Sequence, residues 1–367
     1  MTITPRDTLV VAGHSVVLTY DDAGREYDAI RDSCGALRRD ERGRWTFGGA
    51  GAAAALNGLL TNDVEVLANG EGCYAAALTV KGRIVAYVRV LRRENDFLVD
   101  VASRAAAGWA ALVKKYVNPR MATVAEVSAA MGCIGAYGPR SVVVLSRLTG
   151  LEAHALSAMV PYAHVAATIN GAPVRLLRSP DFGVVGFDVF VDTPKAEAVF
   201  DALIAGGARP VGLAAADIAR VEAGRPEWGI DMDEATLPQE ANLEALHAIS
   251  YTKGCYTGQE VVARVHFRGH VNRHLRGLVA DEPLAPHATV VSTERADVGD
   301  VRSSVVSPRF GPIALAMLRR EISPGDDVIV RAADHELPAR VQTPPFLLAR
   351  ASRAPPDFTT SSTPRSP

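Results

Sequence analysis

The chain has 367 residues and a formal net charge of −2, and about half of its residues are apolar. This length allows two or three domains with a substantial core. The near-neutral charge argues against a nucleic-acid coat protein or a strongly basic membrane binder. Because no run of 18 apolar residues occurs and the first 20 residues lack the layout of a signal or transit peptide, we expect a cytoplasmic protein without membrane spans.

Strand-like and helix-like runs alternate over the first 245 residues. Several strand-like runs follow one another through short turns, at 81–83 and 92–96, which favours antiparallel meanders with helices packed on one face. The sequence therefore predicts an α+β fold and not a doubly wound α/β fold. The predicted strands are 8–13, 44–49, 73–80, 83–91, 96–101, 174–179 and 183–192, and the predicted helices are 50–60, 103–117, 139–149, 194–206 and 213–223.

Beyond about residue 270 the helical pattern gives way to short apolar runs separated by Pro, Gly and Asp turns. These runs, at 274–280, 288–293, 312–318, 327–333 and 336–342, predict a small β-barrel or sandwich. The last 22 residues, 346–367, are rich in Pro, Ser and Thr and are expected to be disordered.

Three patterns that resemble known sites receive a simpler interpretation. The four cysteines are far apart and form no CxxC pair, so we expect free thiols and no disulfide framework or zinc site. Gly49, Gly51 and Ala54 fit a dinucleotide fingerprint, but the following runs look antiparallel, which favours a tight strand-to-helix turn. Three histidines four residues apart, His266, His270 and His274, are interrupted by Gly269, so we expect no metal site.

The stretch YTKGCYTGQEVVARV, residues 251–265, carries the strongest chemical signal. Thr257 and Glu260 fit a capping box that starts a helix over 258–268. Cys255 would then lie just before a helix N-terminus with Lys253 nearby, and both features favour a thiolate. The alternatives are a nucleophilic thiol and a small buried cysteine in a turn; no partner base is visible, so a Cys/His hydrolase is not supported.

Two further stretches place charged residues in unusual positions. GLAAADIARVEAG, residues 212–224, reads as a helix with Arg220 and Glu222 near its C-terminal end, where the helix dipole favours the cation but not the carboxylate. Asp188 follows Gly-Phe in an otherwise apolar strand. A buried carboxylate there needs partners, and a flat heterocycle with adjacent N–H donors would supply them.

These stretches, in this order, resemble the family that contains the glycine-cleavage T-protein and the YgfZ-type folate-binding proteins. The resemblance runs from RDSCGALRRD (31–40) to residue 345 and includes FGGAGAAAALNGLLTNDV (47–64) and LPQEANLEALHAISYTKGCYTGQEVVAR (237–264). The KGCYTGQE form is similar to the YgfZ branch, because the T-protein branch lacks this cysteine. The resemblance implies a three-domain ring around a central channel: two interlocked α+β domains over 1–245 and a β-barrel over 246–345.

One departure concerns the strand at 82–87. The T-protein carries an acidic pair there, one member of which is catalytic, whereas this chain has Ala86 and Tyr87. Neither a methyl group nor a phenol replaces a carboxylate that orients or deprotonates an amine. This departure argues against aminomethyl transfer by the usual mechanism and leaves open whether the chain is an enzyme.

The resemblance implies that tetrahydrofolate, or a one-carbon derivative of it, binds in the channel. The first hypothesis is a folate-binding factor that supports assembly or repair of iron–sulfur proteins, and through them tRNA modification, with Cys255 and Lys253 as the reactive pair and iron–sulfur proteins as partners. The alternatives are a tetrahydrofolate-dependent aminomethyltransferase or demethylase, with Asp63 or Asp188 as substitute carboxylate, and a passive folate-binding scaffold. The predicted cofactor-binding residues are Asn62, Asp63, Asp188, Arg220, Glu222, Gln259, Glu260 and Arg264.

Overall fold

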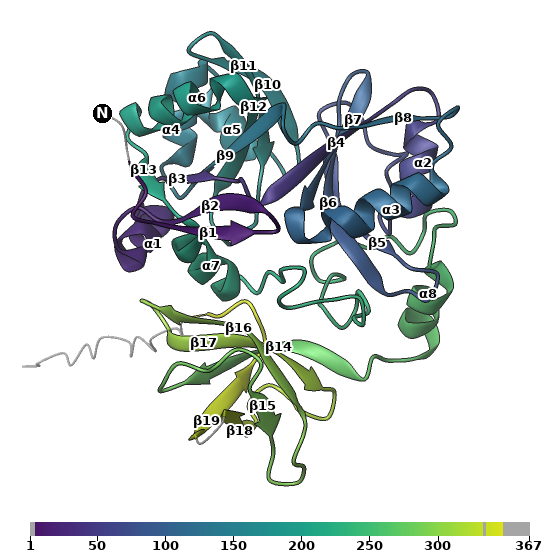
Figure 1. Cartoon of the computed structure of the whole chain (residues 1–367), viewed down its shortest axis with the longest axis vertical. Coiled ribbons are helices and arrows are strands. Elements are labelled where there is room, and N and C mark those ends of the chain that lie inside the picture. The colour runs from purple at the N-terminus through teal and green to yellow at the C-terminus, as the bar shows by residue number, and fades with distance from the viewer. Residues whose placement is uncertain (1–3, 333–334, 348–367) are drawn as a thin grey trace, which may run out of the picture.

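A computed structural model describes residues 4–332 and 335–347 of the chain. Two α+β lobes lie side by side, and a β-barrel lies across their lower edge (Figure 1). Of the segment predicted to be disordered, only residues 346 and 347 are within the described part, and Phe346 is buried; residues 348–367 lie outside it.

The first lobe is built on a six-stranded sheet in the order β10-β11-β12-β9-β3-β13, in which only the β13–β3 pair is parallel. A separate hairpin, β1–β2, belongs to the same lobe. The strands are β1 (Asp7–Val11), β2 (His14–Thr19), β3 (Gly35–Arg38), β9 (Met131–Tyr137), β10 (His164–Ile169), β11 (Ala172–Arg178), β12 (Gly186–Asp192) and β13 (Arg209–Val211). The helices are α1 (Ala23–Asp32), α4 (Ser141–Thr149), α5 (Ala153–Ala158), α6 (Thr193–Ala205) and α7 (Leu213–Glu222).

The second lobe is an antiparallel five-stranded sheet in the order β5-β6-β7-β4-β8, with two helices and a short 3-10 turn. Its elements are β4 (Arg42–Gly48), α2 (Ala52–Leu59), β5 (Gly72–Leu78), β6 (Ile84–Arg92), β7 (Asp96–Ala102), η1 (Ser103–Ala105), α3 (Ala106–Tyr116) and β8 (Thr123–Glu126). The chain leaves the first sheet after β3, builds this entire lobe, and returns at β9. The two lobes are therefore interlocked, as expected.

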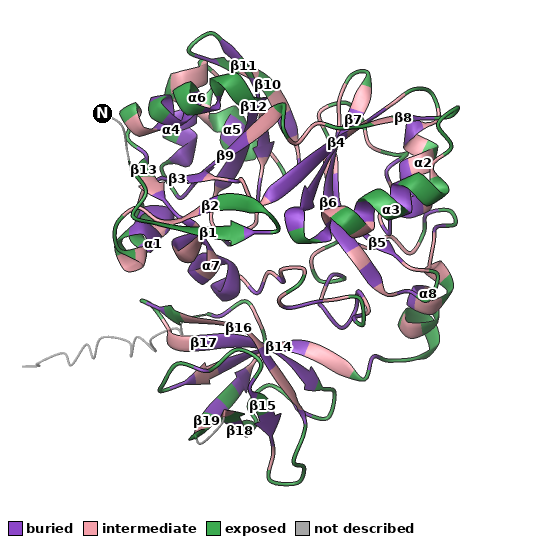
Figure 2. Ribbon diagram, viewed as in Figure 1, coloured by how far each residue is buried: buried purple, intermediate pink, exposed green. Residues whose placement is uncertain are grey.

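Each sheet packs on an apolar core, and the core of the second lobe also includes Cys133, Leu177 and Phe190 of the first sheet. The central strands are buried along most of their length (Figure 2). Strand β6 shows why: IVAYVRVLR is apolar on both faces because the sheet is covered on both sides. Arg89 interrupts this run and is nevertheless only 1% exposed. A guanidinium group in such a place requires carboxylate partners, which marks the region where the two sheets meet.

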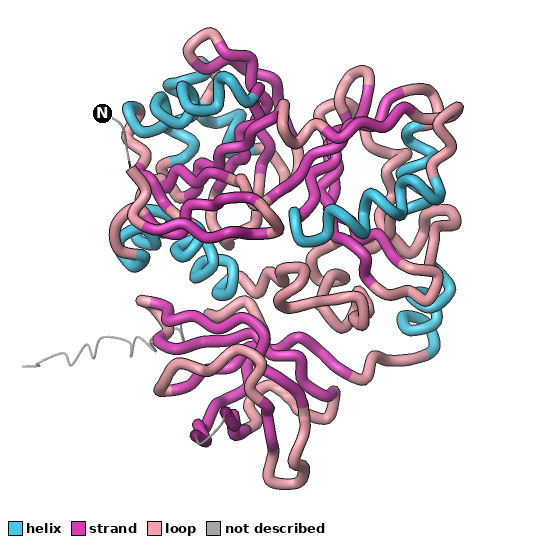
Figure 3. The backbone as a smooth tube through the Cα atoms, viewed as in Figure 1, coloured by secondary structure: helices cyan, strands magenta, loops and turns pink. Residues whose placement is uncertain are grey.

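A long coil, residues 223–258, leads from α7 to helix α8 (Gln259–Arg268), which lies beside the second lobe (Figure 3). The barrel follows, closed in the order β14-β17-β16-β15-β18-β19. Its strands are β14 (Arg273–Ala280), β15 (Thr289–Val291), β16 (Gly299–Ser307), β17 (Gly311–Arg319), β18 (Asp327–Ala332) and β19 (His335–Gln342). The barrel is confirmed; the predicted domain boundary at residue 245 stays a prediction.

The α+β class and every predicted helix over 50–223 are confirmed, with ends displaced by a few residues. The capping-box prediction is wrong: α8 begins after Gly258, which has φ +83° and supplies no side-chain cap, whereas the Thr257 hydroxyl faces the Gly58 carbonyl oxygen at 3.4 Å. No helix within the described residues is long and apolar enough to cross a membrane.

Candidate functional site

Buried arginines and aspartates form a network where β6 and β7 of the second lobe meet β12 of the first. Arg89 donates to both Asp100, at 2.8 and 3.0 Å, and Asp188. Asp188 also accepts from the Tyr137 hydroxyl and lies 3.5 Å from Arg39. Since Asp100 and Asp188 are both 0% exposed, this network joins the two sheets through charges that have no access to water.

Opposing effects fix the protonation states in this network. Burial acts to raise the pKa of Asp100, but Arg42 and Arg89 outweigh it and lower that pKa to about 2. Burial acts to lower the pKa of Arg89, yet its carboxylate neighbours hold the pKa well above the ordinary value. The pKa of Asp181 is likewise well below its usual range, chiefly because of Arg89 and Arg39, against burial. Each of these groups is therefore charged at neutral pH.

A small cavity of about 40 Å³ adjoins this network. Its lining combines guanidinium groups, phenols and carboxylates from both lobes and from the coil after α7. The lining residues are Arg39, Arg42, Tyr74, Tyr87, Arg89, Asp181, Phe182, Arg220, Arg225, Pro226 and Glu227. Arg225 reaches across this wall: it donates to the Tyr162 hydroxyl at 3.1 Å and its guanidinium lies over the Tyr74 ring at 5.6 Å.

Tyr87 and Glu227 form the one close acid–phenol pair of this lining. The Tyr87 hydroxyl donates to Glu227 Oε2 at 2.6 Å. Burial raises the pKa of Glu227, against the opposing effects of Arg220 and Arg42. Burial and Glu227 together raise the pKa of Tyr87 well above 10, so Tyr87 remains a phenol that donates. Although the acidic pair expected on β6 is absent, a carboxylate from the coil therefore occupies this wall.

Lys253 is buried beneath the turn that carries Cys255. Its Nζ donates to the carbonyl oxygens of Asn57, Leu60 and Asn62, each at 2.7 Å. These carbonyls belong to the last turn of α2 and the loop behind it, where a cation satisfies acceptors that the helix leaves free. Burial lowers the pKa of Lys253 to about 8, against the opposing effects of Asp63, Cys73 and Glu65.

Cys255 is the one exposed thiol among the four free cysteines. Burial raises the pKa of Cys34 and Cys73 to about 12, and that of Cys133 well above its ordinary value, which makes all three unreactive thiols. Cys255 lies outside the lining of the central cavity. The structure therefore rejects the buried-cysteine alternative for Cys255, and it directs the Lys253 ammonium to carbonyl oxygens.

We predict that Gly258→Ala destabilises the turn between Cys255 and α8, whereas Gly254→Ala does not. A Cβ at Gly258 would lie 2.5 Å from the Thr79 carbonyl oxygen, and the residue has φ +83°; a Cβ at Gly254 would meet nothing within 4 Å. Left-handed strain and the clash together cost roughly 2 kcal/mol. Urea unfolding of both variants measures the difference, and equal midpoints would contradict this account of the turn.

Arg220 and Glu222 lie at the C-terminal end of α7, as predicted, but both contact protein groups. Arg220 donates to Asp231 at 2.7 Å and to Ser303 of the barrel at 2.8 Å. Glu222 accepts from Tyr27, Arg31 and Ser307, also of the barrel. Their side chains join α7 to the barrel, so contact with the carboxylates of a folate tail would require Arg220 to exchange partners.

The remaining predicted residues are distributed over three places. Asn62 donates to the carbonyl oxygens of Tyr74 and His247 at 2.9 and 2.8 Å, and Asp63 accepts from the Glu65 backbone at 3.2 Å. Gln259 lies in the first turn of α8. The same helix carries the exposed Glu260 and Arg264. Asp188 has Arg89 and Tyr137 on its oxygens, so a pterin edge would have to displace one of them. The predicted set is thus not gathered into one pocket.

The structure explains two of the patterns that the sequence left aside. Gly49 has φ +91° and leads from β4 into α2, and a Cβ at Gly51 would lie 2.7 Å from the Met121 carbonyl oxygen. The strands around this turn are antiparallel, which confirms the tight turn. His266 stacks on Tyr251 at 3.7 Å and lies 2.8 Å from Glu244. Within the described residues, no group of three or more His, Cys, Asp or Glu is arranged to hold a metal ion.

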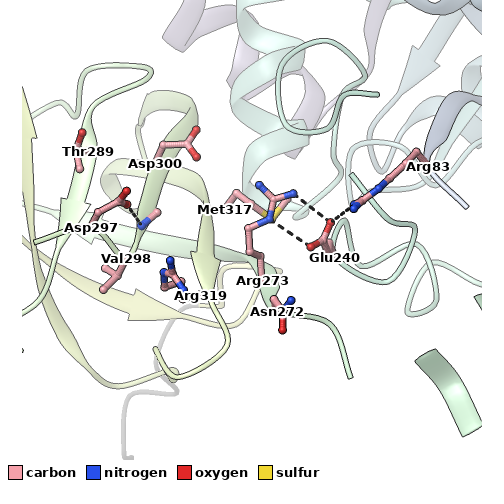
Figure 4. A pocket seen from close by; sticks show the side chains of 11 residues that line it. Arg83, Glu240, Asn272, Arg273, Thr289, Asp297, Val298, Asp300, Met317 and Arg319 are labelled. Atoms are coloured by element: carbon pink, nitrogen blue, oxygen red, sulfur yellow. Dashed lines mark hydrogen bonds and ion pairs between the residues drawn. The ribbon is translucent and has the colours of Figure 1, made fainter. Parts of the chain in front are cut away.

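A larger cavity, about 580 Å³, opens between the barrel and the start of β6 (Figure 4). Glu240 lies between Arg83 and Arg273 and pairs with both, at 3.6 and 3.2 Å. Asp297, Asp300 and Arg319 add charges of both signs to its walls. This cavity shares no lining residue with the central one, and its charges largely balance.

Sequence reasoning missed most of the central site. Arg39 follows β3, whereas Arg42 and Arg89 lie in β4 and β6. The carboxylates that they meet, Asp100 and Asp188, lie in other strands, so the spacing of these residues in the chain carries no signal. The one available signal is a charged residue within a strand that is apolar on both faces, as with Arg89 and Asp100. Glu227 lies in coil, where no periodicity identifies it.

Comparison with known proteins places these features in one family. The family model described as the GCVT N-terminal domain matches residues 9–250, and the glycine cleavage T-protein C-terminal barrel domain matches 273–347. The chain belongs to the glycine-cleavage T-protein family. A protein named aminomethyltransferase from Synechococcus sp. (strain RCC307) is 29% identical, covering 91% of this chain and 93% of its own. One from Streptomyces avermitilis is 31% identical over 83% of each chain.

Comparison with solved structures also identifies the T-protein fold. The crystal structure of the glycine cleavage system aminomethyltransferase T from Bartonella henselae superposes with a TM-score of 0.83, at 22% identity, over 93% of this chain and 94% of that one. Together with the closed six-stranded barrel, this confirms the predicted three-domain T-protein architecture. The YgfZ subtype remains a prediction.

T-protein family members bind tetrahydrofolate or a one-carbon derivative of it. The central cavity matches this group in chemistry: aromatic rings suit a flat heterocycle, Glu227 offers an acceptor for N–H groups, and arginines suit carboxylates. Its volume of about 40 Å³ is far below the roughly 300 Å³ of a small-molecule pocket. Binding therefore requires the wall to open. Arg225 is the residue best placed to move, because it is partly exposed and its one side-chain hydrogen bond within the described residues is to the Tyr162 hydroxyl.

Proposed function

We propose that this T-protein family member is a folate-binding factor that supports iron–sulfur proteins through the thiol of Cys255. The folate would lie in the central cavity, with Arg225 and Arg42 toward its carboxylates and Tyr74 against its ring. Bound tetrahydrofolate supplies a carrier nitrogen for a one-carbon unit. The protein side chains orient it, and their arginines neutralise its negative charge.

The observation that carries the proposal is the exposure of Cys255 in a chain whose β6 lacks an acidic pair. Ala86 and Tyr87 occupy β6, so the usual acidic pair is absent, while the KGCYTGQE turn presents a thiol to solvent. Free cysteines are among the most buried residue types, whereas reactive thiols are accessible to solvent. A single thiol does not complete the ligand set of a cluster, so any cluster chemistry needs a partner protein.

The test is complementation in a strain that lacks the gene. The activity of a [4Fe–4S] enzyme is measured after return of wild type, Cys255→Ala or the control Thr252→Ala, with soluble protein levels matched. Thr252 is an exposed neighbour in the same turn, so its removal alters the surface but not the thiol. We expect wild type and Thr252→Ala to restore activity and Cys255→Ala to fail, with its unfolding midpoint unchanged because the side chain is exposed.

Other results would point elsewhere. If Cys255→Ala restores activity fully, the thiol is dispensable and the passive scaffold is favoured. If deletion leaves iron–sulfur enzymes unaffected, the iron–sulfur part of the proposal fails. In either case, folate binding by the purified protein still reports on the central cavity.

A tetrahydrofolate-dependent aminomethyltransferase is the second candidate. Its support is the name of the relatives and the presence of Glu227, a carboxylate in the cavity wall. Purified protein assayed with an aminomethyl donor and tetrahydrofolate decides the matter, because the first candidate predicts no turnover.

A further inference from the structure

The Tyr87–Glu227 pair has the arrangement of a proton donor and its positioning group. Glu227 Oε2 accepts from the Tyr87 hydroxyl at 2.6 Å. Within the described part of the chain, no hydrogen-bond donor lies on Oε1. Glu227 lines the central cavity, so Oε1 is the oxygen available to a ligand there.

The two residues come from separate elements, and each is fixed by its own surroundings. Tyr87 lies on β6, buried, with Arg42 5.4 Å from its ring centroid. Glu227 is held at its backbone N–H, which donates to Asp231 at 2.8 Å. Asp231 in turn pairs with Arg220 at 2.7 Å, so the coil that carries Glu227 is anchored to α7. The pair is therefore preorganised before any ligand arrives.

We propose that Glu227 is the acid–base residue of the central cavity and that Tyr87 positions it. This inference rests on the proposed binding of folate there. Glu227 transfers the proton on its carboxyl group to the nitrogen of tetrahydrofolate that carries the one-carbon unit. The nitrogen lone pair forms the new N–H bond, and the electron pair of the O–H bond remains on the carboxylate, which Tyr87 stabilises by its hydrogen bond. The reverse transfer returns the proton.

The charges around Glu227 are compatible with this role. The charged and titratable groups that face it are Arg42, Tyr87, Asp217, Arg220 and Asp231. Burial favours the protonated acid and the arginines favour the carboxylate, and burial prevails, so the pKa of Glu227 is raised. A carboxyl group tuned toward neutral pH donates and accepts protons most effectively.

The experiment measures proton uptake when tetrahydrofolate binds. Calorimetric titrations in buffers of different ionisation enthalpy, from pH 5 to 8, give the number of protons exchanged. Above the pKa of free Glu227, wild type should take up a proton on binding, and Glu227→Gln should take up none. Tyr87→Phe should move the pH midpoint of proton uptake to a higher value, because it removes a hydrogen bond that favours the Glu227 carboxylate.

The control is Glu234→Gln, an exposed carboxylate in the same coil, which should leave proton uptake unchanged. If the candidate transferase activity exists, Glu227→Gln should lower kcat by about 10²- to 10⁴-fold. Proton uptake that persists in Glu227→Gln would overturn the inference while leaving folate binding intact. Absence of tetrahydrofolate binding in wild type would overturn the proposed function, and this inference with it.

Discussion

Replacing Arg89 by alanine should destabilise the protein by about 3–5 kcal/mol, among the largest effects of any single substitution in the chain. Arg89 is 1% exposed and serves Asp100, Asp188 and Asp181 at once. Its removal leaves the buried Asp188 and the partly buried Asp181 with weakened compensation. Urea unfolding followed by intrinsic fluorescence measures the loss through the shift in the midpoint.

The matched control is Arg92→Ala, three residues along the same strand. Arg92 is partly exposed, and its guanidinium lies over the Phe97 ring at 4.5 Å. Loss of that contact should cost about 0.5–1 kcal/mol. Equal losses for Arg89→Ala and Arg92→Ala would show that the buried network contributes no more than a surface contact does.

The buried network of arginines and carboxylates affects both ligand access to the central cavity and the stability of the fold. The arginines and carboxylates that hold the two sheets together also form the wall of the central cavity, so a ligand that displaces Arg225 must leave Arg89 and Asp188 in place. The nitrogen–oxygen distance from Arg225 to Asp181 is 3.9 Å, which is longer than the 3.1 Å from Arg89 to Asp181. The outer layer of the network is therefore the movable one, and the inner layer is the scaffold.

The sequence predicted the architecture better than the site because the two depend on different kinds of information. Strands 83–91 and 96–101 and the helix at 213–223 follow from local periodicity, and the structure has them as β6, β7 and α7. Strand β9 was missed because MGCIGAY contains two glycines, which weaken any strand signal. Strand β16 was missed because GDVRSSVVS is largely polar; it is held by pairing with β17 in the barrel.

The site depends on contacts between residues far apart in the chain. The sequence predicts that Asp188 needs a partner, because it is a carboxylate in an apolar strand, but that partner, Arg89, lies 99 residues away. The spacing of two predicts that Lys253 accompanies Cys255, yet its ammonium group binds carbonyl oxygens almost 200 residues earlier. Spacing indicates which residues are unusual; only the fold determines what they meet.

Replacing Glu222 by alanine should weaken the joint between α7 and the barrel, with a loss of about 3 kcal/mol. Glu222 is buried and accepts from Tyr27 at 2.7 Å and from Ser307 at 2.5 Å, besides its ion pair with Arg31. Without the carboxylate, the Arg31 charge and two hydroxyl groups lose their acceptor in a largely buried region. Glu222→Gln keeps the shape and part of the hydrogen bonding, so it should lose about half as much.

The measurement compares urea midpoints with those of Glu197→Ala, which removes an exposed carboxylate paired with Arg38 at 2.6 Å. Because Glu197 is 66% exposed, its loss should cost less than about 1 kcal/mol. If Glu222→Ala costs no more than Glu197→Ala, the barrel is held by its apolar contacts with α7, chiefly around Val221, and the buried acid contributes nothing. Equal losses in Glu222→Ala and Glu222→Gln would instead show that the charge, which both variants lack, couples the barrel to α7.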